Sequence, residues 1–157
     1  MATWRLSATF GGGSMRIRKM LDRKGGFVAT IAPASDVWEA LAELDRHHVG
    51  ALVVSSDGVT PEGIVSERDI VRRLATDGAG VLDGPVSDIM VSELYCASPD
   101  DDVESLMALM TGKRIRHVPV VEGDRLVGIV SIGDVVKERL DALEGDNRAL
   151  VDFIHAR

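Results

Sequence analysis

The fold is decided by a nine-residue stretch that the chain carries twice, as GIVSERDIV at residues 63–71 and as GIVSIGDVV at residues 128–136. Six of the nine positions are identical. In both copies a glycine opens a short apolar run, which a serine and an aspartate follow three residues apart. This pattern is typical of a buried strand that ends where a helix begins. The chain therefore contains a duplicated strand-to-helix junction.

The duplication extends outward from this junction. Upstream, VGALVV at 49–54 aligns with IRHVPV at 115–120, and Pro33 aligns with Pro99, each with an offset of 66 residues. The junction itself has an offset of 65, so the two copies differ by one residue in the intervening loop. Loops accept such length changes at little cost. The pattern predicts two structural repeats that pack together.

Each repeat is expected to form a βαββα unit. In the first repeat the expected order is a β-type segment at 28–31, a helix capped by Ser35 or Asp36, strands at 50–54 and 63–65, and a helix from Asp69 to Gly78. In the second repeat the β-type segments lie at 95–97, 118–121 and 126–130. Helices are expected to start at 100–102 and near Asp134, and the latter is expected to end by Gly145.

The predicted fold class is α/β (α+β), with the two repeats related by a pseudo-twofold axis in one compact pair. Facing hairpin sheets are expected, because about sixty residues make a marginal domain when alone. Residues 1–14, which include the run GGGS at 11–14, are expected to be a flexible or artificially appended extension. The remaining parts are repeat 1 at 15–80, a linker at 81–90, repeat 2 at 91–145 and a helical tail at 146–157.

The duplicated stretch resembles the signature of the CBS domain, named after cystathionine β-synthase. That signature reads glycine, two apolar residues, Ser or Thr, two variable residues and Asp, and the phrase RHVPV at 116–120 resembles the preceding strand of the family. The resemblance covers about residues 15 to 145, in the layout of small stand-alone bacterial CBS-pair proteins. It implies a flat pair, or Bateman module, that forms disc-like homodimers and binds AMP, ADP, ATP, S-adenosylmethionine or NAD.

The polar pair of each junction provides the candidate ligand groups. Ser66 and Ser131 can offer a hydroxyl and a helix N-terminus to a phosphate, while Asp69 and Asp134 can accept both hydroxyls of a ribose. Helix capping explains either residue in one copy. It does not explain why both recur while the residues between them differ, so the ligand interpretation is favoured.

Basic residues near the second junction are candidates for phosphate contact. Arg68 lies inside the first motif, and Arg116 and His117 precede the strand of the second repeat. The resemblance implies that this region faces the cleft. Lys113 and Arg114 are interpreted instead as a solvated helix end, where basic groups complement the helix dipole.

Adenine is expected against the strands that open and flank each repeat, where backbone groups can read its edge and apolar side chains can sandwich its ring. The predicted pocket-lining residues are Thr30, Ile31, Ala51, Cys96, Ala97 and Pro119. Which of the two sites is filled is not decided by the sequence.

Composition argues against several other functions. The net charge of −7 disfavours broad contact with nucleic acid, which needs an excess of Lys and Arg. The single Cys96 allows no intrachain disulfide and lacks an identifiable base, and the adjacent His47 and His48 lack a third metal ligand. No catalytic residues, no metal site and no membrane span are predicted, and cytoplasmic residence is expected.

The leading hypothesis is therefore a non-catalytic adenylate or energy sensor that forms a homodimer and acts on a separate, unidentified effector protein. One alternative is a scaffold that kept the fold and mediates protein interaction without a ligand. A nucleic-acid binder and a nucleotide-processing enzyme are more distant alternatives.

Overall fold

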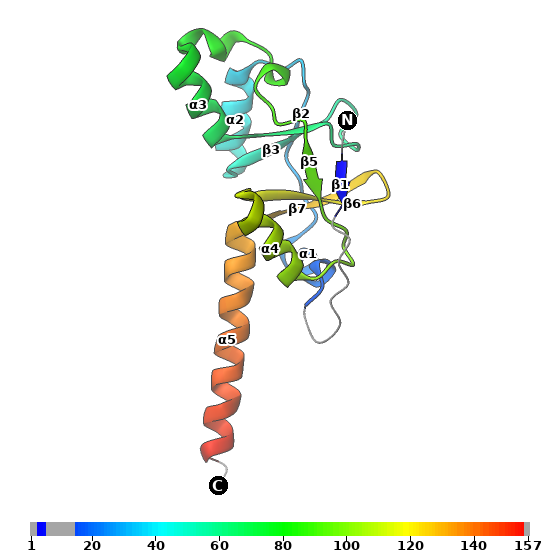
Figure 1. Ribbon diagram of the computed structural model, residues 1–157, viewed down its shortest axis with the longest axis vertical. Coiled ribbons are helices and arrows are strands. Elements are labelled where there is room, and N and C mark those ends of the chain that lie inside the picture. The colour runs from blue at the N-terminus through cyan, green and yellow to red at the C-terminus, as the bar shows by residue number, and fades with distance from the viewer. Residues whose placement is uncertain (1–2, 6–14, 156–157) are drawn as a thin grey trace.

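The computed structural model describes residues 3–5 and 15–155 and contains the two predicted βαββα repeats (Figure 1). Repeat 1 comprises β2 (Thr30–Ile31), α2 (Val37–His47), β3 (Ala51–Val54), β4 (Gly63–Ser66) and α3 (Glu67–Asp77). Repeat 2 comprises β5 (Leu94–Cys96), α4 (Val103–Lys113), β6 (His117–Glu122), β7 (Arg125–Ser131) and α5 (Ile132–His155). The predicted mixed α/β fold class is confirmed.

The two repeats use the same local devices. In repeat 1 the Asp36 carboxylate, not Ser35, accepts a hydrogen bond from the Glu39 N–H at 2.7 Å and so caps α2. In repeat 2 Asp102 caps α4 in the same way through the Ser105 N–H at 2.8 Å. In both repeats this helix leads into an antiparallel hairpin, β3–β4 or β6–β7. In repeat 1 the opening strand β2 pairs in parallel with β3, the first strand of the hairpin. In repeat 2 the corresponding contact is a single parallel bridge between Ala97 and Val120 of β6.

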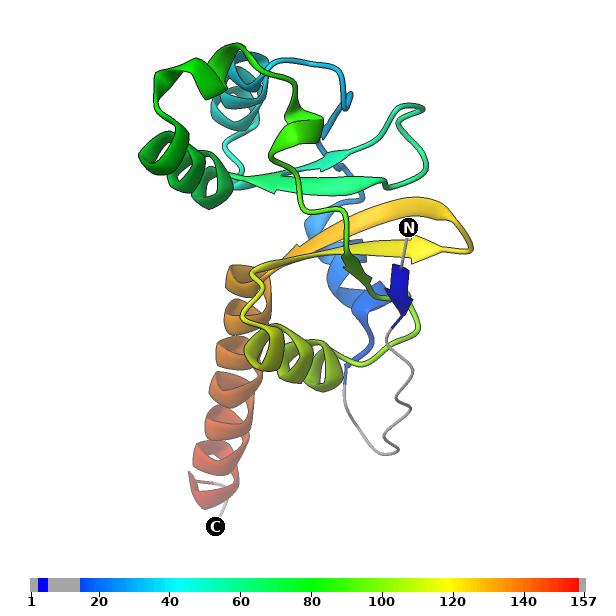
Figure 2. The same ribbon diagram turned by 45° about the horizontal axis from the view of Figure 1, so that its top comes forward.

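The hairpins of the two repeats lie against each other (Figure 2). The Leu126 N–H, near the start of β7, donates a hydrogen bond to the Val59 carbonyl oxygen in the loop between β3 and β4, at 2.8 Å. Ile64 of repeat 1 also packs on a small buried cluster in repeat 2, which consists of Leu94, Cys96 and Val121. The interface between the repeats is therefore both apolar and hydrogen-bonded.

The segment that precedes each repeat packs on the other repeat. Helix α1 (Ile17–Lys24) buries Ile17, Met20 and Leu21 in the core of repeat 2. The 3₁₀ helix η2 (Val86–Asp88) and the residue after it bury Val86 and Ile89 in the core of repeat 1. A second 3₁₀ helix, η1 (Ala79–Asp83), connects α3 to η2. We call α1 and the segment 86–90 the crossing segments, because each precedes one repeat in the chain and packs in the core of the other repeat.

The glycine that opens each duplicated motif makes this crossing possible. A Cβ at position 63 would lie 2.6 Å from the Met90 Sδ, and a Cβ at position 128 would lie 2.7 Å from the Leu21 Cδ2. Both distances are shorter than van der Waals contact. A side chain at either position would therefore force Met90 or Leu21 to move away from the strand.

Two expectations differ from the structure at the ends of the chain. The last helix does not end at Gly145 but continues to His155, because one glycine inside a helix costs only about 1 kcal/mol and no proline follows it. Residues 3–5, which were expected to be part of an extension, form β1 (Thr3–Arg5) and pair in parallel with β5. The expected GGGS linker at 11–14 lies outside the described residues.

Replacing Gly128 by alanine tests the close packing of α1. The new methyl group must displace Leu21, which is 8% exposed, so we expect the free energy of unfolding to fall by about 1–3 kcal/mol in urea denaturation. The matched control is Gly112→Ala in α4, where a Cβ would meet no atom within 4 Å. That change should be neutral or stabilising, because alanine favours helix. Equal effects of the two substitutions would contradict the packing argument.

Candidate functional site

A groove of about 300 Å³ lies between the repeats, at the junction of β4 and α3. Its walls come from this junction, from the segment that leads into β5, and from the end of α4 and the start of β6. The lining residues are Gly50, Ile64, Ser66, Glu67, Arg68, Asp69, Arg72, Val91, Glu93, Leu94, Tyr95, Arg114, Ile115, Arg116, His117 and Pro119. The structure thus brings the first motif together with the basic segment of repeat 2.

Ser66 and Asp69 form a capping box at the start of α3. The Asp69 N–H donates to the Ser66 Oγ at 3.3 Å, and the Asp69 Oδ2 accepts from the Ser66 N–H at 3.0 Å and from its hydroxyl at 2.5 Å. These carboxylate bonds all end on Oδ2. The capping role and a ligand role are therefore compatible, because no hydrogen bond from the residues at 3–5 and 15–155 ends on Oδ1 of this half-buried carboxylate, which leaves it for a hydroxyl donor in the groove.

Four guanidinium groups line the groove together with the carboxylates of Glu67, Asp69 and Glu93, in a chain of net charge −7. Arg68 and Arg72 come from α3, and Arg114 and Arg116 come from the turn between α4 and β6. The turn holds Arg114 at a left-handed φ of 55° as the C-cap of α4. Guanidinium groups bind phosphate oxygens through paired hydrogen bonds, so these four side chains suit a phosphorylated ligand.

The groove lining also includes apolar side chains and one aromatic ring. These are Ile64, Val91, Leu94, Ile115 and Pro119, together with Tyr95. The Lys113 Nζ lies 5.3 Å from the centroid of the Tyr95 ring, a cation–π distance that holds the ring in place. Apolar side chains and guanidinium groups in one groove suit a ligand that has both a flat heterocycle and anionic groups.

His117 lies where the two repeats meet. Its ring approaches the backbone of Gly50, where a Cβ would be 3.5 Å from both Cε1 and Nε2. Burial and then the positive charge of Lys24 lower the pKa of His117 below its ordinary value of 6.5, and nearby Asp134 and Glu67 only partly oppose this. His117 is therefore neutral at pH 7 and can both donate and accept a hydrogen bond.

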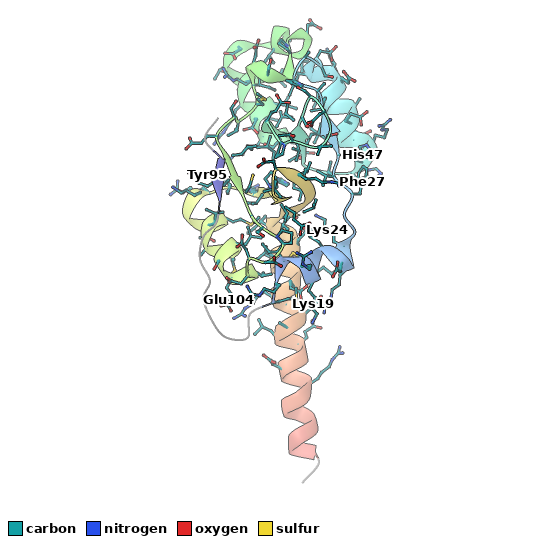
Figure 3. The ribbon with its side chains drawn as sticks, turned by 90° about the vertical axis from the view of Figure 1, so that its right-hand side faces the viewer. Lys19, Lys24, Phe27, His47, Tyr95 and Glu104 are labelled. Carbon is teal, nitrogen blue, oxygen red and sulfur yellow. The ribbon has the colours of Figure 1, made fainter. Side chains whose placement is uncertain are left out.

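The second motif is built in the same way but its carboxylate is engaged by a lysine. The Asp134 Oδ2 accepts from the Ser131 N–H at 2.8 Å and from the Lys24 Nζ at 2.5 Å, and Lys24 also donates to the Ile129 carbonyl oxygen at 3.0 Å. Figure 3 shows Lys24 at the end of α1, beside the start of α5. Burial alone would raise the pKa of Asp134, but these hydrogen bonds hold it below the ordinary 3.8.

The predicted site residues therefore fall into two sets. Those that line the groove are Ser66, Arg68, Asp69, Arg116, His117 and Pro119. Those that do not are Thr30, Ile31, Ala51, Cys96, Ala97, Ser131 and Asp134. In this second set Ile31, Ala51, Cys96 and Ala97 are buried in strands or beside them. The Ala97 N–H donates to Pro119 and its carbonyl oxygen accepts from Val121, so its backbone groups are used by β6.

Several groove residues were not found by sequence reasoning. Arg72 follows Asp69 by three residues, so its position on the same helix face could have been read from the helical period. Arg114 was interpreted as a solvated helix end, and its place in the groove depends on the left-handed turn after α4. Tyr95 lies in the opening segment 95–97 against which adenine was expected, although it was not named as a site residue, and Glu93 carries no motif that would identify it.

Some kinds of site are absent from the part of the chain that the structure describes. Among these residues no group of three His, Cys, Asp or Glu side chains is arranged to hold a metal ion. None of the helices placed in 15–155 is both long enough and apolar enough to span a bilayer.

Comparisons with known proteins match this architecture. The CBS domain family matches at residues 27–76 and again at 86–141. The mitochondrial CBS domain-containing protein CBSX3 of Arabidopsis thaliana is 41% identical over 105 residues, which are 64% of this chain and 51% of that protein. The chain thus spans about half the length of this curated relative.

Two solved structures cover most of the chain. The CBS-domain containing protein ATU1752 of Agrobacterium tumefaciens is 44% identical with a TM-score of 0.76, and the match covers 80% of this chain and 99% of that one. The CBS domain protein PAE2072 of Pyrobaculum aerophilum, complexed with AMP, is 32% identical with a TM-score of 0.71, over 83% of this chain and 97% of that one.

The Lys24–Asp134 ion pair is testable through its pH dependence. Because the folded-state pKa of Asp134 is lowered, the pair stabilises the fold above the ordinary pKa of 3.8 and loses this effect as the pH falls below that value. We expect Lys24→Met to lower the free energy of unfolding by about 1 kcal/mol at pH 7. The difference should shrink toward zero on acidification.

The control for this experiment is Lys19→Met, an exposed position on the same helix, which should change little at any pH. Unfolding by urea, followed by circular dichroism at a series of pH values, measures both variants. A Lys24→Met deficit that is the same at acidic and neutral pH would show that the ion pair is not its cause.

Proposed function

Because this chain belongs to the CBS-domain family, we propose that it is a non-catalytic regulatory module that binds an adenine nucleotide in the groove at the first junction. The observation that carries the proposal is the meeting of Asp69, four arginines and several apolar side chains in one groove between the repeats. These are the three chemistries that a ribose, a phosphate chain and an adenine ring require.

Asp69 is the proposed ribose ligand. Its Oδ2 is held by the capping box, which fixes the orientation of the carboxylate before any ligand arrives. A carboxylate that is already oriented loses little conformational freedom on binding, so the charge-assisted hydrogen bonds to a sugar diol contribute more of their energy.

The arginines are proposed to bind the phosphates. Arg68 and Arg72 come from repeat 1, whereas Arg114 and Arg116 come from repeat 2, so one phosphate chain would connect both repeats. A ligand of this kind would stabilise one relative placement of the repeats. That coupling is the proposed means by which nucleotide binding is passed to a separate effector protein.

The proposal assigns one nucleotide to each chain. Asp134 already accepts a hydrogen bond from Lys24, and a ribose at the second motif would have to displace that ammonium group. The complex of the similar Pyrobaculum protein with AMP supports an adenosine-containing ligand. Homodimerisation, cytoplasmic residence and the choice among AMP, ADP, ATP and NAD remain predictions.

Asparagine substitutions distinguish the two motifs. Asp69→Asn keeps the size of the side chain and one capping acceptor but removes the charge, so we expect AMP affinity in isothermal titration calorimetry to fall by roughly 10- to 100-fold. The matched control is Asp134→Asn, which should leave AMP affinity within about twofold because that carboxylate lies outside the groove. The reverse pattern would place the ribose at the second motif.

A second prediction concerns the phosphates. Arg116→Gln should weaken ATP more than ADP and ADP more than AMP, and should leave adenosine nearly unaffected, because each phosphate adds charge that the guanidinium offsets. Arg73→Gln is the control, since Arg73 is paired with Asp77 at 3.3 Å and does not line the groove. Equal losses for adenosine and ATP would exclude Arg116 from phosphate binding.

A further inference from the structure

The C-terminal helix α5 carries a stripe of exposed apolar residues that no other part of the described chain covers. Val136, Leu140 and Leu143 are 51%, 55% and 53% exposed. The neighbouring Val135 is 1% exposed and packs in the core of repeat 2, so α5 has one face on the repeat and a different apolar face toward solvent. Figure 1 shows the helix projecting away from both repeats.

The residues of this stripe are spaced as in a coiled coil. Starting from Val136, seam positions follow at intervals of four, three, four, three and four residues, and the residues there are Val136, Leu140, Leu143, Asn147, Leu150 and Ile154. Such alternation averages 3.5 residues and keeps one stripe facing a partner helix along its whole length. In heptad terms Leu140, Asn147 and Ile154 occupy position a, and Val136, Leu143 and Leu150 occupy position d.

The polar member of the stripe indicates which partner and orientation fit. A buried asparagine at position a is well satisfied when its amide pairs with another asparagine, but not when it faces a leucine. In a parallel pair each a position faces the same residue of the other helix, so Asn147 meets Asn147 of a second copy. In an antiparallel pair position a faces position d, and the amide would be opposite a leucine.

The flanking charges agree with the parallel arrangement. Arg139 lies at position g and Glu144 at the following e position, five residues later. In a parallel, in-register pair Arg139 of each copy faces Glu144 of the other, which gives two ion pairs by symmetry. Within the chain the contact of Arg139 with Glu104 is long, at 3.8 Å, and both side chains are more than half exposed, so it does not compete strongly.

We propose that residues 136–154 of α5 pair with the same residues of a second copy of this chain as a parallel two-stranded coiled coil. The seam is about 28 Å long at 1.5 Å per residue. A helix of this length with an internal glycine is marginal in water by itself, and burial of the stripe against a partner stabilises it. Such a coil would hold two grooves in one particle, and the proposal does not depend on what the groove binds.

Cysteine cross-linking in the full chain tests the pairing. In Asn147→Cys the two new thiols face each other across the seam, so mild oxidation should convert most of the protein to a covalent dimer on a non-reducing gel. The native Cys96 is fully buried and can remain. Arg148→Cys, one residue along and outside the seam, should stay largely uncross-linked. Equal cross-linking of the two variants, or none in Asn147→Cys, would overturn the proposal.

A second pair of variants ties the cross-link to the apolar stripe. Adding Leu143→Glu to Asn147→Cys places a charge in the seam and should slow cross-linking by roughly tenfold or more. Adding Ala142→Glu instead, at an exposed position beside the seam, should not slow it. Circular dichroism verifies that each variant is folded. If both additions slow the reaction equally, or neither does, the stripe is not the contact surface.

Discussion

The close approach of each crossing segment to the strand of the opposite repeat is the constraint on which the structure depends. Leu21 reaches Gly128 and Met90 reaches Gly63, at distances that leave no room for a Cβ. Through these contacts α1 completes the core of repeat 2, and the segment around η2 completes the core of repeat 1. This exchange joins the two repeats, and the groove lies between them.

The same exchange makes two nearly identical motifs unequal. Three residues beyond Leu21 lies Lys24, which donates to Asp134, whereas three residues beyond Met90 lies Glu93, which lines the same groove as Asp69. A glutamate has the same charge as Asp69 and cannot neutralise it. Asp134 is paired with Lys24 and Asp69 lines the groove, and this difference comes from the crossing segments, not from the motifs.

Much of the fold could be predicted from the sequence because the repeat, the caps and the turns are local signals. The duplicated GIVS stretch predicted both hairpins and both junctions, and the polar pair Ser66 and Asp69 was predicted at the groove. The role of Lys24 could not be predicted, because it contacts a residue 110 positions away. Arg114 depends on a left-handed backbone turn, and Cys96 and Ala97 face the core because of strand pairing that only three-dimensional packing determines.

The central claim is that one groove, at the first motif, holds one adenine nucleotide while Lys24 keeps the second motif closed. Native mass spectrometry of the full chain with an excess of AMP counts the bound ligands for each subunit directly, whatever the number of subunits in the particle. The account predicts one AMP per chain. Two AMP molecules per chain, or none with AMP, ADP, ATP and NAD alike, would contradict it.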